Sequence, residues 1–284
     1  MKRKWFAVGI ILLFLGTCLI PAIAHDIKKP LPALRGIWLY VGGSGPGNYS
    51  KIQDAVDNAS DGDTVFVYDD PAPYYEMVGI SKSIHLIGED KKTTVIDGRH
   101  QVVAVSLLAD NITFTGFTVQ NATLFLSHGM YVCGNDNIIS DNIFLQNEIS
   151  DIYLLHSTNN TIRENTFTYS MIGVYLIESN DTTITRNIIT KNYEFGIALV
   201  NSKRNIISQN NIMDNEHHDA FFTRDLGNNL LSNHWDANYW GRPYLLPKRI
   251  HGQLILLEII FFALSFPQLN FDWHPAQEPY DIPG

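Results

Sequence analysis

The chain has 284 residues, of which 45% are hydrophobic and 17% charged, and its formal net charge is −9. The hydrophobic content is that of a folded protein and excludes an intrinsically disordered chain. The negative charge argues against nucleic acid as a partner, because phosphate binding requires a basic surface.

The N-terminal segment has the features of an export signal. Basic residues at 2–4 precede an uncharged apolar run over 5–20, and the A-x-A pattern at 22–24 offers a cleavage site before His25. The apolar run is short for a membrane-spanning helix, so cleavage is expected, with an uncleaved anchor that contacts the membrane as the alternative. Residues 1–24 are therefore predicted to be a signal peptide or anchor. The rest of the chain is predicted to be secreted or to lie in the cell envelope.

Residues 50–60 are predicted to form a short amphipathic helix. Ser50 and Gln53 have the spacing of a capping box. The apolar residues of this segment share one helical face, namely Ile52, Ala55, Val56 and Ala59. Because a stack of repeats leaves apolar side chains open at its end, we expect this helix to cover the N-terminal end. Short β-branched segments then predict strands within 65–67, 84–87, 94–98, 103–107 and 112–119.

From residue 111 to residue 234 the chain repeats with a period of 22 or 23 residues. One phrase, I-x-x-N-x-(I/F), carries asparagines that are 23, 22 and 23 residues apart, at Asn142, Asn165, Asn187 and Asn210. A second phrase, of the type G-V-Y-L, keeps the same register and begins at Gly129, Asp151, Gly173, Gly196 and Asp219. Two independent phrases with one period indicate a repeat architecture.

A period of this length predicts one turn of a parallel β-helix. Two or three short strands fit into it, with Gly, Asn and Asp at the corners. Leucine-rich repeats need a stricter leucine frame, and helical repeats need longer units. The predicted fold is all-β, a single-stranded right-handed parallel β-helix solenoid over residues 25–241. Stacked coils lie about 4.8 Å apart, so the four repeat asparagines should form a ladder of side-chain amide hydrogen bonds.

The second phrase also predicts an aromatic ladder on the outside of the coils. Its third residue should point outward, which places Tyr131, Tyr153 and Tyr175 on one face, with Ala198 interrupting and Phe221 resuming. Aromatic rings along a groove suit the apolar faces of sugars, so these residues are candidates for ligand binding. The alternative is that the rings only stabilise the sheet through pairs on the same face.

The densest polar cluster lies at the end of the repeats. His217, His218 and Asp219 are candidate ligand-binding residues, and the alternative is a solvated or structural cluster. Because side chains alternate along a strand, we expect His217 and His218 on opposite faces. One metal ion is then hard for both to bind, and no metal or catalytic residue is assigned here, with a metal site or a catalytic base left as further alternatives.

Residues 242–284 are predicted to form a C-terminal cap and tail. Within them, 253–266 is apolar except for Glu258. Its 14 residues are too few to span a bilayer, so a helix or strand that covers the last coil is expected, with membrane contact as the alternative.

Several segments match one known family. They read GNYSKIQDAV at 47–56, GDTV at 62–65, YE at 75–76, ISKSIHLIG at 80–88, TVIDG at 94–98 and NHWDANYWG at 233–241. In these segments the chain resembles NosD-type right-handed β-helix proteins of the pectin-lyase-like superfamily, which include carbohydrate-binding proteins and sugar hydrolases. The tail at 271–281 is similar to that of archaeal envelope members. The resemblance covers about residues 40–241 and implies the fold more specifically than the function.

Three functions remain open. The hydrolases of this fold carry Asn-Thr-Asp, Asp-Asp, Gly-His-Gly and Arg-x-Lys motifs, and the repeated coils lack this set. The favoured function is a non-catalytic envelope β-helix that binds a polysaccharide or an envelope protein on its lateral face. The alternatives are a polysaccharide lyase, hydrolase or epimerase with an unrecognised site and, as the resemblance implies, an accessory protein for copper-centre assembly. Copper(I) prefers sulfur ligands, and the sequence has no Cys-x-x-Cys or Met cluster. No cofactor is predicted, since neither copper nor calcium has support in the sequence.

Overall fold

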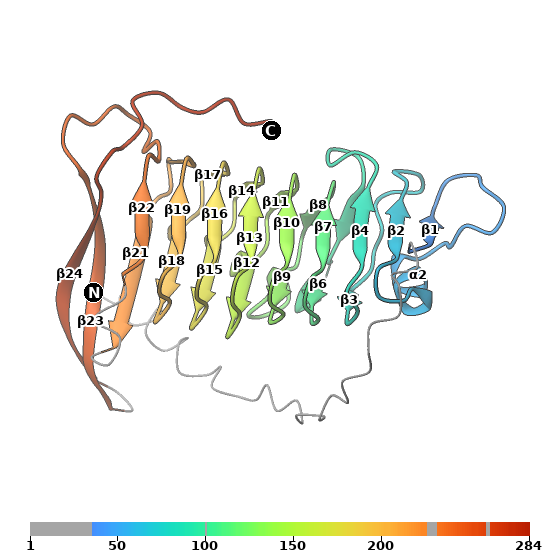
Figure 1. The fold of residues 1–284 in the computed structure, drawn as a ribbon, viewed down its shortest axis with the longest axis horizontal. Coiled ribbons are helices and arrows are strands. Elements are labelled where there is room, and N and C mark those ends of the chain that lie inside the picture. The colour runs from blue at the N-terminus through green and yellow to red at the C-terminus, as the bar shows by residue number, and fades with distance from the viewer. Residues whose placement is uncertain (1–35, 100, 226–231, 260–261) are drawn as a thin grey trace. The chain divides into compact units, whose positions relative to one another are not determined.

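The chain winds into a right-handed parallel β-helix, as predicted (Figure 1). The computed structural model describes residues 36–99, 101–225, 232–259 and 262–284. The expected signal peptide or anchor at 1–24 lies outside the described residues. The strands form three columns that run along the helix axis, and the central coils contribute one strand to each.

Strands in each column pair in parallel with the coil before and the coil after. The first column contains β1 (Trp38–Val41), β2 (Thr64–Val67), β4 (His85–Gly88), β7 (Thr113–Thr115), β10 (Ile138–Ser140), β13 (Thr161–Arg163), β16 (Thr183–Thr185), β19 (Ile206–Ser208) and β22 (His234–Asp236). The second contains β3 (Val78–Ile80), β6 (Val103–Leu107), β9 (His128–Val132), β12 (Ser150–Leu155), β15 (Ile172–Ile177), β18 (Phe195–Val200) and β21 (His218–Asp225). The third contains β5 (Val95–Asp97), β8 (Thr118–Gln120), β11 (Ile143–Leu145), β14 (Thr166–Thr168), β17 (Ile188–Thr190) and β20 (Asn211–Met213).

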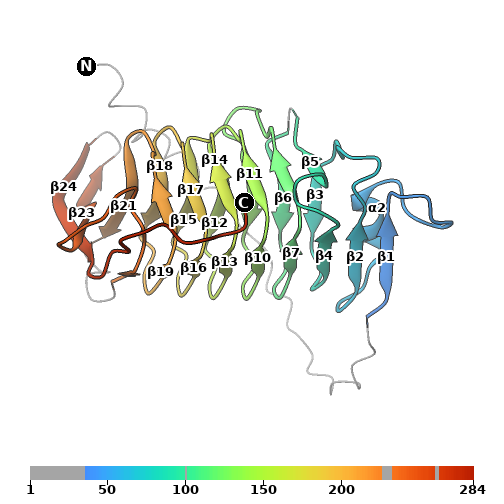
Figure 2. The same ribbon diagram turned by 90° about the horizontal axis from the view of Figure 1, so that it is seen from above.

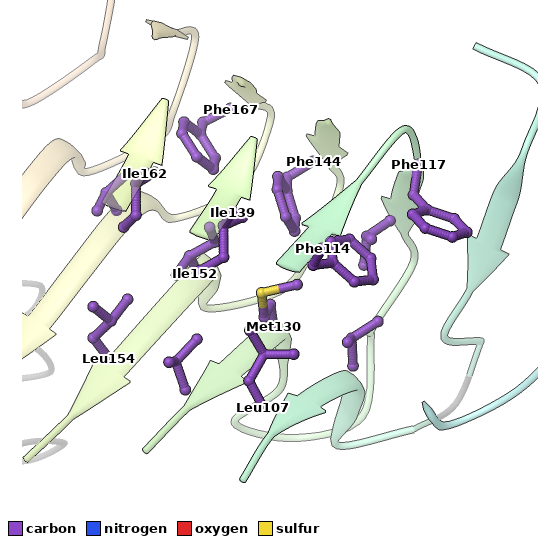
Figure 3. Packing of buried hydrophobic residues seen from close by; sticks show 14 of the residues in the cluster. Leu107, Phe114, Phe117, Met130, Ile139, Phe144, Ile152, Leu154, Ile162 and Phe167 are labelled. Atoms are coloured by element: carbon purple, nitrogen blue, oxygen red, sulfur yellow. The ribbon is translucent and has the colours of Figure 1, made fainter. Parts of the chain in front are cut away.

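The core consists of inward-facing side chains that stack from coil to coil. In the first column Phe114, Ile139 and Ile162 are register partners and are fully buried. In the third column Phe144 and Phe167 stack at 5.2 Å between ring centroids (Figure 3). Because strand side chains alternate between the two faces, the same apolar position of each repeat enters the core.

The predicted asparagine ladder is confirmed. The side-chain amide of Asn142 donates to Oδ1 of Asn165 at 3.0 Å, and Asn187 donates to Asn210 at 2.9 Å. The same Oδ1 atoms also accept from the backbone N–H groups of the preceding coil. All four side chains are fully buried, so these bonds satisfy polar groups that would otherwise destabilise the interior. The ladder continues beyond the prediction, because Asn210 donates to Asn238 at 2.9 Å.

The predicted helix forms as α2 (Ile52–Asn58), but the capping box does not. Its N-cap residue, Lys51, makes no side-chain capping bond. Instead the carboxylate of Glu76, from the next coil, accepts the backbone N–H groups of Ile52 and Gln53 at 2.9 and 3.1 Å. Gln53 is thereby released to bond the backbone of Gly79. The predicted apolar face is buried and covers the N-terminal end, as expected.

A hairpin of two long strands, β23 (Lys248–Ile259) and β24 (Phe262–Asp272), continues the C-terminal end of the stack. β23 pairs with β21, and β24 pairs with β22. The expected C-terminal cap is therefore a hairpin of strands. No helix in the described part of the chain is long and apolar enough to cross a membrane.

Beyond the hairpin, residues 273–284 return along the outside of the coils toward the N-terminal end (Figure 2). The side-chain amide of Asn211 holds this tail by exchanging two hydrogen bonds with the backbone of Tyr280, each at 2.8 Å. Further along, the buried Lys91 donates to the carbonyl of Pro283 and to Asp141, both at 2.7 Å.

Candidate binding surfaces on the lateral face

The predicted tyrosine ladder lies on the outer face of the second column. Tyr131, Tyr153 and Tyr175 are register partners, and successive ring centroids are 5.8 and 5.3 Å apart. The expected stacking is therefore present. The expected exposure is not, because Tyr153 is only 5% exposed. Its ring lies between the other two tyrosines and also stacks on His128 at 4.6 Å.

The side chains around the ladder are shielded from solvent. Burial raises the pKa of the Tyr175 phenol, with a smaller contribution from Tyr153. Burial likewise lowers the pKa of His128 to about 4, so this imidazole is neutral at physiological pH and shares a 2.7 Å hydrogen bond with Ser150. A buried stack of this kind mainly stabilises the sheet.

The ladder continues toward the C-terminal end as predicted. Ala198 interrupts it, and Phe221 pairs with Ala198 in register. Phe221 is half-buried and stacks on Phe195 at 5.3 Å. Together these two rings form an apolar wall beside the histidine cluster.

The expectation that His217 and His218 face opposite sides is wrong. Their rings are 4.7 Å apart and perpendicular. The strand β21 begins only at His218, so the alternation rule does not apply to His217 in the preceding turn. A third imidazole, His251 of β23, stacks on His218 at 5.7 Å. It was missed because it lies beyond the regular repeat and reaches its neighbour only through the pairing of Phe221 with His251.

The third candidate of this cluster, Asp219, bonds to Asn215. Its Oδ1 accepts from the side-chain amide of Asn215 at 3.2 Å. Burial raises the pKa of this carboxyl, and the bond from Asn215 partly offsets the effect. The arrangement resembles that of Asp151, which begins the second phrase three repeats earlier.

Asp151 is the most perturbed acid in the described part of the chain, and it lies inside the wall of the solenoid. Its Oδ1 accepts from Asn147 at 2.9 Å and from Ser170 at 2.5 Å, whereas Oδ2 has no hydrogen-bond partner. Burial raises the pKa of Asp151 to about 8. Because the residue is 0% exposed, its carboxyl cannot reach a bound polymer, and we assign it no catalytic role.

Sequence reasoning also missed an exposed aromatic patch at the N-terminal end of the first column. This aromatic patch consists of Trp38 and Tyr40 on β1, Phe66 on β2 and the adjoining Tyr68. Trp38 is 54% exposed and Tyr40 is 39% exposed. Neighbouring rings are 5.1 to 6.3 Å apart. The signal that could have revealed it is the spacing W-x-Y and F-x-Y, because aromatic residues two positions apart lie on the same face of a strand.

The edge of the aromatic patch carries polar groups. Asp69 and Asp70 directly follow Tyr68 and are exposed. Asn48 lies in the neighbouring loop, where its side-chain amide donates to the carbonyl of Gly42 at 2.6 Å. Apolar ring faces with acceptors beside them can contact both the C–H faces and the hydroxyl groups of a sugar.

Comparisons with known proteins agree with the fold. A family model described as "Periplasmic copper-binding protein (NosD)" matches residues 56–240. A pectin methylesterase solved in complex with a hexasaccharide is similar, with a TM-score of 0.57, 11% identity and coverage of 80% of this chain and 84% of that chain. The pectin methylesterase PemA from Erwinia chrysanthemi has a TM-score of 0.55, 10% identity and coverage of 83% and 86%. Identities this low indicate a shared fold only. A comparison with curated proteins gives no match.

The family description names copper, and the described residues lack a pair of the thiolate donors that copper(I) prefers. Cys133 is the only cysteine among the described residues, so they provide no thiolate pair for copper(I). Nor is there, in the described ranges, any group of three or more His, Cys, Asp and Glu side chains that could hold a metal ion.

Proposed function

The chain belongs to the NosD family, and from this premise we propose that it acts outside the cytoplasm as a non-catalytic β-helix that binds a neutral polysaccharide on its lateral face. The observation that carries the proposal is the exposed aromatic patch, in which four rings gather on two adjacent coils. The family description, which names a periplasmic protein, supports the location.

Exposure of the rings supports a binding role for the aromatic patch. An isolated exposed aromatic residue is ordinary, but four neighbouring rings on one face form a contiguous apolar surface. Trp38 retains 54% of its surface and is therefore available to stack on a sugar ring. The tyrosine ladder of the second column is a weaker candidate, since its central ring, Tyr153, is enclosed by its neighbours.

Charge favours a neutral polymer as the ligand. The chain carries a formal net charge of −9, and Asp69 and Asp70 lie at the edge of the aromatic patch. A polyuronate would meet like charges there, which disfavours its binding. A neutral polysaccharide can instead donate its hydroxyl groups to these carboxylates.

The positions of the acids with a raised pKa favour a non-catalytic role. Glycoside hydrolysis requires a carboxylic acid with a raised pKa close to a second carboxylate. In the described part of the chain, the acids with a raised pKa are Asp151 and Asp219, both in the second column, and not beside the aromatic patch. Asp151 is also sealed from solvent.

The proposal is tested by a glycan array followed by calorimetry with the strongest neutral oligosaccharide and by mass spectrometry of the incubated sugar. Replacing Trp38→Ala should weaken binding at least tenfold, because Trp38 offers the largest exposed ring of the aromatic patch. The matched controls are Tyr193→Ala and Trp273→Ala, which remove rings that are 52% and 61% exposed elsewhere. Equal affinity of Trp38→Ala and the parent chain would refute the binding surface. Shortened or unsaturated products would refute the non-catalytic role.

A further inference from the structure

A pocket of about 510 Å³ lies next to the aromatic patch, at the turn between the first and third columns. Its walls are the ends of β4 and β7, the segment 89–92, Asp141 and residues 283–284 of the tail. A pocket of this volume is large enough to hold a small ligand or part of a longer one.

The pocket is continuous with the aromatic patch along the outer face of the first column. Tyr40 and Phe66 of the aromatic patch are register partners, and the next coil places Ile87 beside Phe66. Ile87 in turn pairs with Thr115, and both line the pocket. The strands involved, β1, β2, β4 and β7, follow one another along the axis (Figure 1). Because coils lie about 4.8 Å apart, an extended ligand that stacks on the rings and follows the axis reaches the pocket within two coils.

A buried lysine provides a fixed hydrogen-bond donor in the pocket. Lys91 is only 8% exposed, and its ammonium donates to the carboxylate of Asp141 and to the carbonyl of Pro283, both at 2.7 Å. An ammonium group has three N–H donors, so one remains for a ligand. The ion pair also orients Asp141, whose side chain is 53% exposed and can accept a hydrogen bond from a ligand.

The other polar groups around the pocket suit a neutral ligand with many hydroxyl groups. Glu89 and Asp90 add exposed carboxylates, Lys92 adds an exposed ammonium, and Thr115 adds a hydroxyl. A sugar hydroxyl can donate to a carboxylate and accept from an ammonium, so it can use both kinds of group. Two lysines stand beside three carboxylates, and charges that nearly balance do not favour a polyuronate or a polycation.

We infer that this pocket is a second subsite for the polysaccharide, in which hydrogen bonds hold the sugar units that follow those on the aromatic patch. The ligand is then a linear neutral polymer that runs along the solenoid axis over the first column. The inference rests on the proposed function, because the pocket extends a binding surface that begins at the rings. A carboxylate of the pocket is bonded to the edge of that surface, since Glu89 accepts the backbone N–H of Asp69 at 3.1 Å.

The test is calorimetry of the full chain with a disaccharide and a pentasaccharide of the neutral polymer that binds most strongly on the glycan array. The pentasaccharide should bind about tenfold more tightly, because only this sugar is long enough to reach from the rings into the pocket. Thr115→Val and Lys92→Ala should each weaken pentasaccharide binding about fivefold, as expected for the loss of one hydrogen bond, and leave disaccharide binding unchanged. Trp38→Ala should weaken the binding of both sugars.

Matched controls separate the pocket from general effects of the substitutions. Thr185→Val alters the threonine at the same position of β16, three coils beyond Thr115. Lys191→Ala alters an exposed lysine at another turn. Neither control should change the affinity for either sugar. All four positions are half-buried or exposed, and circular dichroism verifies that each variant is folded.

Three results would overturn the inference, and they differ in what they mean for the proposed function. If both sugars bind the parent chain equally well and Trp38→Ala weakens both, the aromatic patch binds sugar and the pocket is not a subsite. If the pentasaccharide binds more tightly but Thr115→Val and Lys92→Ala match their controls, the additional sugar units lie elsewhere. If neither sugar binds, or if Trp38→Ala changes neither affinity, the polysaccharide proposal fails and the subsite fails with it.

Discussion

Asp272 accepts a hydrogen bond from the side-chain amide of Asn238 at 3.0 Å and so ends the asparagine ladder. Its Oδ2 also accepts from the backbone N–H of Asn238 at 2.9 Å and from the indole of Trp240 at 3.0 Å. Each asparagine donates to the coil that follows, so the last one needs an acceptor that has nothing to donate in turn. An ionised carboxylate is such a group. Asp272 belongs to β24, and this bond network therefore joins the hairpin to the stack.

Replacing Asp272→Ala should lower the free energy of unfolding by about 3 kcal/mol, because several buried donors lose their acceptor at once. Urea unfolding followed by circular dichroism measures the change, and hydrogen exchange should show the largest loss of protection in β22 and β24. The exposed Asp214→Asn is the control and should change stability little. A similar stability of Asp272→Ala and the control would contradict the role given to Asp272.

Asp151 should make the protein less stable as pH rises. Its folded pKa of about 8 exceeds the ordinary value of 3.8. Between these values the folded state keeps a proton that the unfolded state loses, so stability falls from about pH 4 to about pH 8. Exchanging Asp151→Asn removes this titration and should stabilise the protein by about 4 kcal/mol at pH 7.

The measurement for Asp151 is urea unfolding of both proteins at pH 4.5 and pH 8. The advantage of Asp151→Asn should grow with pH, whereas the exposed Asp54→Asn should show no such trend. A constant difference between Asp151→Asn and the parent chain at both pH values would rule out a titrating buried carboxyl.

His128 should have the opposite effect on stability, at lower pH. Its folded pKa of about 4 is below the ordinary value of 6.5. On acidification through this range the unfolded state takes up a proton first, so stability falls by up to about 3 kcal/mol between pH 6.5 and pH 4. The variant His128→Gln can retain a hydrogen bond to Ser150 without titrating, and its stability should fall less. Thermal melts at pH 4.5 and pH 7 test this, and parallel losses in both proteins would contradict it.

Tyr153 should matter for stability rather than for ligand binding. It is 5% exposed and stacks on His128, Tyr131 and Tyr175. Substituting Tyr153→Ala should therefore cost about 3 kcal/mol by leaving a cavity in the stack. The exposed Tyr193→Ala should cost much less. Below the melting temperature the polysaccharide affinity of Tyr153→Ala should equal that of the parent chain, and a selective loss of affinity would return the tyrosine ladder to the binding surface.

The parts of the fold that follow the period could be predicted from sequence. Asn142, Asn165 and Asn187 recur at one position of the coil, and a parallel stack places such residues in contact. Where the period breaks, the prediction fails. Asn238 follows Asn210 by 28 residues, so the last member of the ladder was missed. The cap of α2 was wrong for a related reason, since Glu76 reaches the helix from another coil and has no fixed spacing from it.

The candidate sites were less predictable than the fold. Residues 38, 40, 66 and 68 come from different coils, and their grouping into the aromatic patch depends on how the first two coils pair. The meeting of His218 and His251 depends on the hairpin at the C-terminal end. Alternation along a strand can be read from the sequence, but the residue at which the strand begins cannot. The prediction for His217 was wrong because β21 begins one residue after it.

The sequence by itself determined that the chain is a parallel β-helix, because a 22- or 23-residue period with alternating apolar residues and recurrent asparagines can bury its side chains and satisfy its amides only by stacking. Tertiary structure decided which outward-facing side chains remain accessible. Tyr153 and Trp38 are both aromatic and both face outward. Side chains of the coils on either side enclose Tyr153, whereas Trp38 lies on β1, the first strand described, and remains exposed. The exposure of an outward-facing side chain depends on the residues that the adjacent coils place beside it, and its position in the sequence alone does not reveal them.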